Sequence, residues 1–296
     1  MKRSSVSVTN GTITCVIAIL ARFRYSLERL RKGLAVEIYV LFFVATIVAG
    51  AINSLAGGGG LITFTLLLLV VPPVTADATS AVALLPAYPA AVWGSRKQLP
   101  PMHDRLLWLL LIPSLLGGLL GALLLAWSGN RNFVVLIPWL VLASTLLILL
   151  RPVLVPRSNR RRFSSAPWFW PVAVVAVFVV AIYGGFFGAG IGILMISALS
   201  FPELEDMRHV VALKNLLTGG LRGIAVAVLV VEGVVNWSYG VPMALGGLAG
   251  GYLGGALSGR ANPTVLRWIV ILIGFVVTAY YFWILYGPPE PHIGGE

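Results

Sequence analysis

Two glycine-rich segments inside long apolar stretches are the first features of this chain that suggest chemistry. Their glycines are Gly57, Gly58, Gly59 and Gly60 in the first segment, and Gly188 and Gly190 in the second. Four consecutive glycines strongly weaken a helix, so we expect the helices to break there within the membrane. A helix that restarts at a break exposes N–H groups at the positive end of its dipole, and such ends bind anions. The segments therefore predict an anion site, to which Asn53 and Ser54 add side-chain donors, or else tight glycine-mediated helix packing.

A stripe of polar residues marks a helix predicted over 207–231. Its members are Lys214, Asn215, Thr218 and Arg222, which at 3.6 residues per turn point at about 0°, 100°, 40° and 80°. Charges within a membrane face the protein interior or an aqueous path and are functional by default. Because no acidic residue is expected inside a span, an anionic substrate is the predicted partner of the two cations. The alternatives are snorkelling of Lys214 and pairing of both cations with acidic loop residues.

In the first half, the corresponding polar pair is Thr79 and Ser80, shortly after Asp77. These two residues are expected either to cap the start of a helix or to line the same pocket.

The composition requires a membrane around these segments. The chain is 58% apolar and only 10% charged, with a mean hydropathy of +0.94, whereas soluble domains carry about 25% charged residues. Stretches without Asp, Glu, Lys, Arg or His span 38–76, 78–95, 106–130, 132–150, 163–202, 233–259 and 268–289. About 20 apolar residues of helix cross a bilayer, and spanning backbone must satisfy its own hydrogen bonds. We predict an all-α integral membrane protein, a duplicated helical bundle of about eight spans with glycine-broken helices in each half.

Matching motifs indicate the duplication. Gly57 and Gly59 align with Gly188 and Gly190, and 117–121 aligns with 250–254, at offsets of 131 to 133 residues. We expect a first membrane repeat over 34–150, a basic linker over 151–167, a second repeat over 168–287 and a short tail over 288–296.

The arrangement of Lys and Arg predicts the topology. One net crossing by 38–76 would place the N-terminal segment, loop 96–105 and linker 151–162 on one side, as the positive-inside rule favours. We therefore expect both termini in the cytoplasm. Residues 1–33 form a basic extension whose apolar run, 11–21, is too short to span. A membrane-surface amphipathic segment, or an extension added by a misplaced start codon, is preferred to a signal peptide.

Other functions find little support in the sequence. The net charge of +11 lies beside the apolar spans, as topology determinants and lipid contacts do, so nucleic acid is not an expected partner. Cys15 is the only cysteine, and the three histidines are scattered, so no disulfide, redox pair, metal site, cofactor or catalytic residue is predicted. The expected partners are a small anion, the lipid bilayer and a second copy of the chain.

The segments 49–60, 78–80 and 183–190 resemble the TauE/SafE family of sulfite and organosulfonate exporters. The resemblance covers about residues 36–286. It implies a bacterial inner-membrane permease for sulfite, sulfonates, thiosulfate or related small anions. Without a phosphate-binding loop for ATP, we expect a secondary transporter; a passive anion channel and a membrane-embedded enzyme or assembly factor are the alternatives.

Overall fold

The computed structural model describes residues 37–54, 57–94, 105–154, 169–199, 207–256 and 263–286. These residues form helices and turns, without a strand among them, so the all-α prediction is confirmed for this part of the chain. The extension 1–33, the tail 288–296 and most of the linker 151–167 lie outside the described residues. The helices are Glu37–Ser54, α2 (Gly59–Leu68), α3 (Pro73–Leu84), α4 (Ala87–Gly94), α5 (Arg105–Leu154), α6 (Phe169–Phe186), α7 (Ile191–Leu199), α8 (Met207–Val231), α9 (Trp237–Ala256) and α10 (Pro263–Tyr286).

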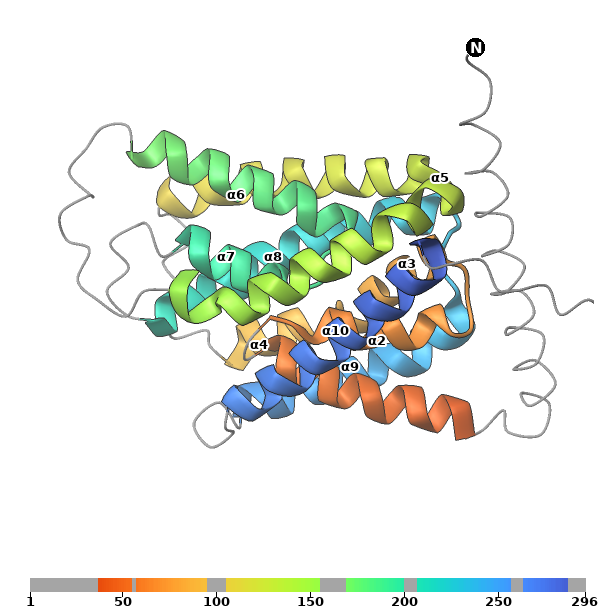
Figure 1. Cartoon of the computed structure of the whole chain (residues 1–296). Coiled ribbons are helices and arrows are strands. Elements are labelled where there is room, and N and C mark those ends of the chain that lie inside the picture. The colour runs from red at the N-terminus through yellow and green to blue at the C-terminus, as the bar shows by residue number, and fades with distance from the viewer. Residues whose placement is uncertain are drawn as a thin grey trace, which may run out of the picture.

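The helix α5 is a hairpin of two antiparallel helices (Figure 1). The turn is at Gly129, whose φ of 64° and ψ of 162° are not helical. A positive φ is unfavourable for residues with a Cβ atom, so glycine is the natural residue at this reversal.

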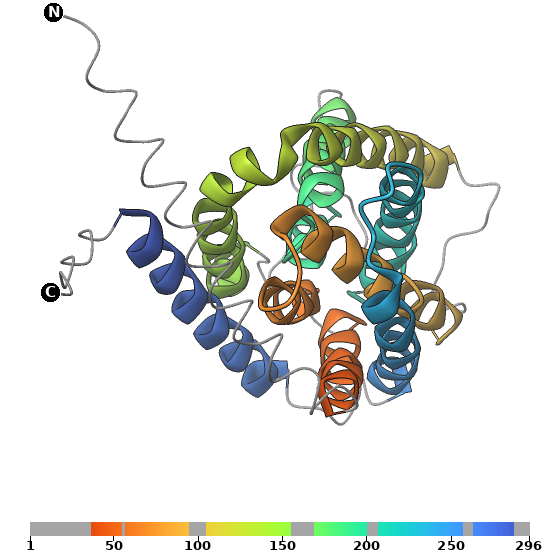
Figure 2. The same ribbon diagram turned by 90° about the vertical axis from the view of Figure 1, so that its right-hand side faces the viewer.

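Within the described part of the chain, three stretches are long and apolar enough to cross a membrane: Glu37–Ser54, Leu107–Leu150 and Val210–Val231. The second of these is the α5 hairpin. Shorter apolar helices lie at Gly59–Leu68, Trp170–Phe186 and Ile271–Ile284. In the view along the bundle, the short helices α2 and α3 lie near the centre with longer helices around them (Figure 2).

The helices run between two ends of the bundle, which we name after Glu37 and Arg105. Helix 37–54 and α9 are parallel, since Tyr39 stacks near Tyr239 at 5.4 Å and Ser54 packs against Gly254. The start of α3 lies at the Glu37 end, where the Val74 N–H donates to Asn130 Oδ1 at 3.1 Å, beside the α5 turn.

The helix pair α3–α4 then crosses in the same direction as helix 37–54, because Ala83 and Ala87 pack along α9 against Gly247 and Gly251. Its end, α5's two termini and the start of α6 therefore lie at the Arg105 end (Figure 1).

The predicted single net crossing of 38–76 is wrong. Helix 37–54 crosses toward the Arg105 end, and α2 then returns to the Glu37 end, starting with Gly59 against the carbonyl of Ala49. Likewise α7 returns to the end where α6 began, since Leu199 packs with Leu107 and Val210. The physical reason is that each glycine segment reverses the chain instead of continuing it. The end of α4, both termini of α5 and the start of α6 lie at one end of the bundle, and Glu37 lies at the opposite one.

The outer surface is apolar in the way a lipid-facing surface is. Large side chains such as Val175, Leu245 and Leu272 are 59%, 60% and 67% exposed. Exposed tryptophans lie near both ends: Trp127, Trp237 and Trp283 toward the Glu37 end, and Trp93, Trp170 and Trp268 toward the Arg105 end. Soluble proteins rarely expose so much apolar surface, and tryptophan is enriched at both membrane–water interfaces.

This arrangement predicts which residues share a side of the membrane. In a Cys15→Ser background, single cysteines at Glu37 and Asn132, both exposed, should react with an impermeant thiol reagent from the same side. A cysteine at Arg105, also exposed, should react only from the other side. Labelling of Glu37→Cys and Arg105→Cys from one side would contradict the reversal by α2.

Candidate anion site

The two glycine breaks touch each other at the centre of the protein. A Cβ atom on Gly57 would overlap the Cα atom of Gly192, and a Cβ atom on Gly192 would lie 2.5 Å from the Cα atom of Gly57. Only two glycines allow main chains to approach this closely. The breaks are therefore one structural unit formed by residues 135 positions apart in the chain (192 − 57).

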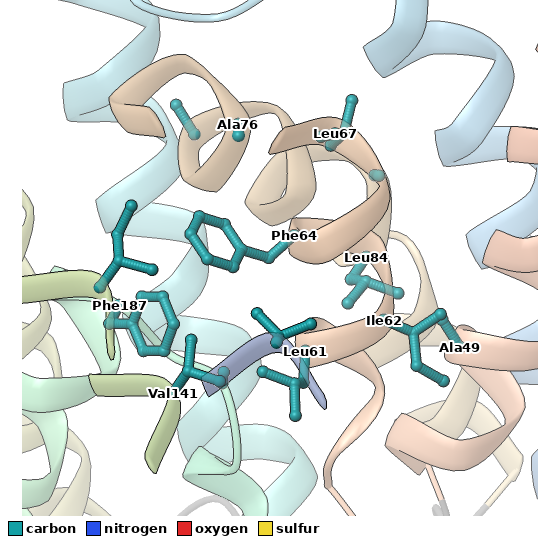
Figure 3. Packing of buried hydrophobic residues seen from close by; sticks show 14 of the residues in the cluster. Ala49, Leu61, Ile62, Phe64, Leu67, Ala76, Leu84, Val141 and Phe187 are labelled. Carbon is teal, nitrogen blue, oxygen red and sulfur yellow. The ribbon is translucent and has the colours of Figure 1, made fainter. Parts of the chain in front are cut away.

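Buried apolar side chains pack between α2, α3, α5 and the residue that follows α6 (Figure 3). The rings of Phe64 and Phe187 meet edge to face with centroids 5.0 Å apart, and Phe64 and Phe187 are 1% exposed. Around them pack Leu61, Leu84 and Val141. Such surroundings exclude water and strengthen any electrostatic interaction inside them.

Each break ends one helix and begins another. Gly57 has a φ of 84° and Gly188 a φ of 69°, which are left-handed values, and α2 and α7 begin soon afterwards at Gly59 and Ile191. Gly58 is the N-cap of α2 and makes no side-chain cap, and Gly190 has a φ of 74°. The nearest atoms to a Cβ on Gly60 belong to Ala189 and Gly188. The positive ends of α2 and α7 thus meet, which is the arrangement that the glycine segments predict for an anion.

The polar stripe of α8 lies inside the protein. Lys214, Asn215, Thr218 and Arg222 are 1%, 3%, 1% and 6% exposed. The predicted helix 207–231 and its buried polar face are therefore confirmed. Among the described residues, Thr218 Oγ1 and Asn215 Oδ1 have no hydrogen-bond partner.

Both cations of α8 bind carbonyls at helix ends beside the breaks. Lys214 Nζ donates to the carbonyl of Asn53 at 3.4 Å, near the end of helix 37–54. Arg222 Nη2 donates to the carbonyl of Phe187 at 3.0 Å, just after α6. Cations stabilise the negative ends of helices, so both also have a structural role. Neither bond involves the acidic loop residues considered as alternative partners of the two cations. Glu232 is exposed, and Glu203, Glu205 and Asp206 lie outside the described residues.

Arg222 keeps a donor that its structural role does not use. Its Nη1 atom is buried and has no hydrogen-bond partner among the described residues. A buried, charged donor without a partner is costly, because it has lost its water and gained nothing in return. The guanidinium also lies directly over Gly188, where a Cβ atom would overlap its Nη2.

The structure places the predicted residues of the first half differently. Thr79 and Ser80 are buried inside α3, which begins at Pro73, so the N-cap interpretation is wrong. Thr79 Oγ1 accepts from the Asn236 N–H at 3.0 Å, and Ser80 Oγ is 2.6 Å from Thr63 Oγ1 of α2.

Asn53 and Ser54 are buried at the end of their helix. Ser54 Oγ donates to the carbonyl of Ala51 at 3.0 Å and packs against Gly254 of α9. Ser54 therefore belongs to the contact between helix 37–54 and α9 and not to the groups around Arg222. Asn53 contributes its main-chain carbonyl, which accepts from Lys214.

Two residues near Arg222 were not in the predicted site. Asp77 is 2% exposed within α3, which corrects the expectation that no acidic residue lies inside a span. Tyr183 Oη donates to the carbonyl of Ala189 at 2.8 Å, and both Asp77 and Tyr183 interact electrostatically with Arg222. Asp77 was not predicted because it directly follows the charge-free stretch 38–76, a position that indicates the first residue after a span. Tyr183 was not predicted because no local sequence pattern distinguishes it. Among the described residues, no group of three His, Cys, Asp or Glu side chains could hold a metal ion.

Comparison with known proteins identifies the family. The sulfite exporter TauE/SafE family matches residues 42–281, which include both breaks and the whole α8 stripe. The chain belongs to the TauE/SafE family. The resemblance of segments 49–60, 78–80 and 183–190 to this family is thereby confirmed.

Two related proteins carry general names. A probable membrane transporter protein of Haemophilus influenzae is 29% identical over 252 residues, covering 83% of this chain and 95% of the relative. The probable membrane transporter protein YfcA of Escherichia coli strain K12 is 29% identical over 246 residues, covering 81% and 87%. Neither name is that of an enzyme or states a substrate, and no solved structure matches the chain significantly.

The contact between Gly188 and Arg222 gives a test of this site. Gly188→Ala should lose about 1–2 kcal/mol of stability from the positive φ, and should also displace the guanidinium and weaken anion binding about tenfold or more. Gly233→Ala is the matched control, since Gly233 has a φ of 67° but no atom within 4 Å of a Cβ. It should lose stability and keep anion binding. Thermal unfolding with and without anion measures both effects, and equal anion binding by the two variants would separate Gly188 from the site.

Proposed function

We propose that this TauE/SafE protein is a secondary transporter, a permease for a small sulfur-containing anion such as sulfite, a sulfonate or thiosulfate. The substrate would bind where the N-termini of α2 and α7 meet, next to Arg222. The observation that carries the proposal is the unpartnered Nη1 of Arg222, beside two converging helix N-termini. A bound anion would give this donor its missing hydrogen bond.

The chemistry of the site favours a compact oxyanion. A guanidinium presents parallel N–H donors that match two oxygens of one sulfur centre. The hydrogen bond from Nη2 to the carbonyl of Phe187 holds this guanidinium in a fixed orientation. Thr218 lies one turn before Arg222, so its unpartnered hydroxyl is on the same stripe and would bind a third oxygen. The family description names sulfite, which fits these donors.

We further propose that the two halves, 34–150 and 168–287, are duplicated and inverted relative to each other. Two matched contacts support this: Gly250 packs on the carbonyl of Ile47 as Gly117 packs on that of Phe178. One turn further, Gly254 packs on the Ala51 carbonyl as Gly121 packs on that of Ile182.

The first half runs from the Glu37 end to the Arg105 end, and the second half returns. Inverted repeats that hold a substrate at broken helices transport by rocking around the fixed site, and this is the mechanism we propose.

The basic residues suggest an orientation in the inner membrane. The segments between α4 and α5 and between α5 and α6 connect helix ends at the Arg105 end, and their sequences include Arg96, Lys97 and the arginines at 157 and 160–162. Counted without the basic extension 1–33, these charges would place the Arg105 end in the cytoplasm by the positive-inside rule. The Glu37 end would then face outward, together with the end of α10, in place of the cytoplasmic position expected from the sequence.

A transporter differs measurably from the other functions considered. Flux of radiolabelled sulfite or thiosulfate into proteoliposomes should saturate with concentration and should accelerate when unlabelled anion is present on the far side. A channel would lack this acceleration, and an enzyme or assembly factor would show no flux.

Anion affinity should depend on Arg222. Arg222→Gln should weaken binding of thiosulfate or methanesulfonate about 30-fold or more, the equivalent of about 2 kcal/mol for a lost buried charged partner. Arg222→Lys should recover part of the affinity, because a point charge replaces the planar fork. The measurement is the rise in melting temperature of the purified protein on adding each anion.

The matched control is Arg131→Gln, since Arg131 is an exposed arginine beside the α5 turn and does not belong to the buried stripe of α8. It should keep full stabilisation by the anion. If Arg222→Gln also keeps it, the anion site lies elsewhere and Arg222 serves only the Phe187 carbonyl.

A further inference from the structure

A buried carboxyl group beside Arg222 has no role in the anion site described so far. Asp77 lies on α3 and is 2% exposed, and its Oδ2 atom has no hydrogen-bond partner among the described residues. It is the only carboxyl among their buried side chains. An ionised carboxyl away from water needs a compensating charge or has to take up a proton.

Its electrostatic neighbours are both attached to the second break. Arg222 donates to the carbonyl of Phe187 at 3.0 Å, and the hydroxyl of Tyr183 donates to that of Ala189 at 2.8 Å. Asp77 follows Ala76, which lies with Phe187 in one buried cluster (Figure 3), and α3 packs on α8, so its carboxyl is within electrostatic reach of both groups. Neither of them donates a hydrogen bond to its Oδ2. The compensating charge of Asp77 is therefore the same guanidinium that the anion would use.

We propose that Asp77 binds a proton together with the anion and so couples anion transport to proton movement. This inference rests on the proposed anion site. Without the anion, the charge of Arg222 compensates an ionised Asp77. When an anion reaches Arg222, two negative charges share one guanidinium, and a proton from water on Asp77 removes their repulsion. Each ligand then increases the affinity for the other, as linkage requires.

The other charged and titratable groups around α3 do not replace this pairing. This helix packs against α2, α5, α8 and α9. From α2 no titratable side chain is present, and the described Arg131 of α5 is exposed at the turn. On α9, Tyr239 is stacked near Tyr39 and Tyr252 is 65% exposed.

On α8, the other cation whose side chain the structure describes is Lys214, which donates to the Asn53 carbonyl at 3.4 Å. An anion bound to Arg222 would thus change the electrostatic environment of Asp77.

The test is the number of protons taken up when the anion binds. Thiosulfate is the probe, because it is the anion of a strong acid and stays ionised near neutral pH. Added to the purified protein in weakly buffered detergent solution with a pH indicator, it should cause uptake of up to one proton per anion bound. Asp77→Asn should bind thiosulfate without proton uptake and about tenfold more tightly, because Arg222 is no longer shared. Asp77→Glu should retain the uptake.

The control is Glu232→Gln, which removes an exposed carboxyl at the Glu37 end and should behave like the wild type. Binding of thiosulfate to the wild type without proton uptake would overturn the coupling and leave the anion site standing. If the wild type does not bind thiosulfate, sulfite or methanesulfonate, the proposed function fails and the coupling with it. If Asp77→Asn does not fold, the wild type and Asp77→Glu still decide the question.

Transport gives a second measurement. In proteoliposomes, an acidic exterior should drive accumulation of ³⁵S-labelled thiosulfate by the wild type. Asp77→Asn should still exchange labelled for unlabelled thiosulfate, but it should not accumulate it. Accumulation by Asp77→Asn equal to that of the wild type would contradict the proposal.

Discussion

The contact between the main chains of Gly57 and Gly192 is the constraint on which the rest of the interior depends. The backbones meet so closely that a single methyl group on either residue would overlap the other chain. At this contact, two segments must leave the helical conformation deep in an apolar interior, where unpaired N–H groups are costly. The positive ends of α2 and α7 are thereby held together, and neither could be retained in lipid unless protein surrounded it.

The buried charges follow from the same constraint. A break leaves carbonyls at the end of the preceding helix, and α8 supplies a lysine and an arginine to two of them, Asn53 and Phe187. These bonds account for the presence of cations, but not for the whole guanidinium of Arg222, whose Nη1 has no partner among the described residues. One side of this group holds the break in place, and the other side is the one that the proposed anion site would use.

Close glycine contacts also constrain how the helices could move relative to one another. Helix 37–54 lies along α9 with Gly246, Gly250 and Gly254 on its carbonyls, and α6 lies along α5 through Gly117 and Gly121. Each pair joins an element of one half to an element of the other. Rocking of strict sequence halves would have to break these contacts, since packed interfaces shift between discrete arrangements and do not deform continuously. The moving bodies are therefore better sought among helices linked by such contacts than among residues 34–150 and 168–287.

The sequence by itself determined the local properties of this protein. Uninterrupted apolar stretches require helices in a membrane, four glycines require a break, and the spacing of Lys214, Asn215, Thr218 and Arg222 places them on one face. The buried face of α8 follows because exposing it to lipid would be costly, so these features needed no knowledge of neighbours.

Only the tertiary structure decided the direction of the chain after each break. Counting Lys and Arg could not reveal that α2 turns back, because a ten-residue helix adds no charge to either side. Nor could it show that Asp77, four residues into α3, lies inside the protein beside Arg222, or that Ser54 faces α9. Such pairings join residues far apart in the chain: Lys214 and Asn53 are separated by 161 positions. They depend on how helices pack, which no local pattern encodes.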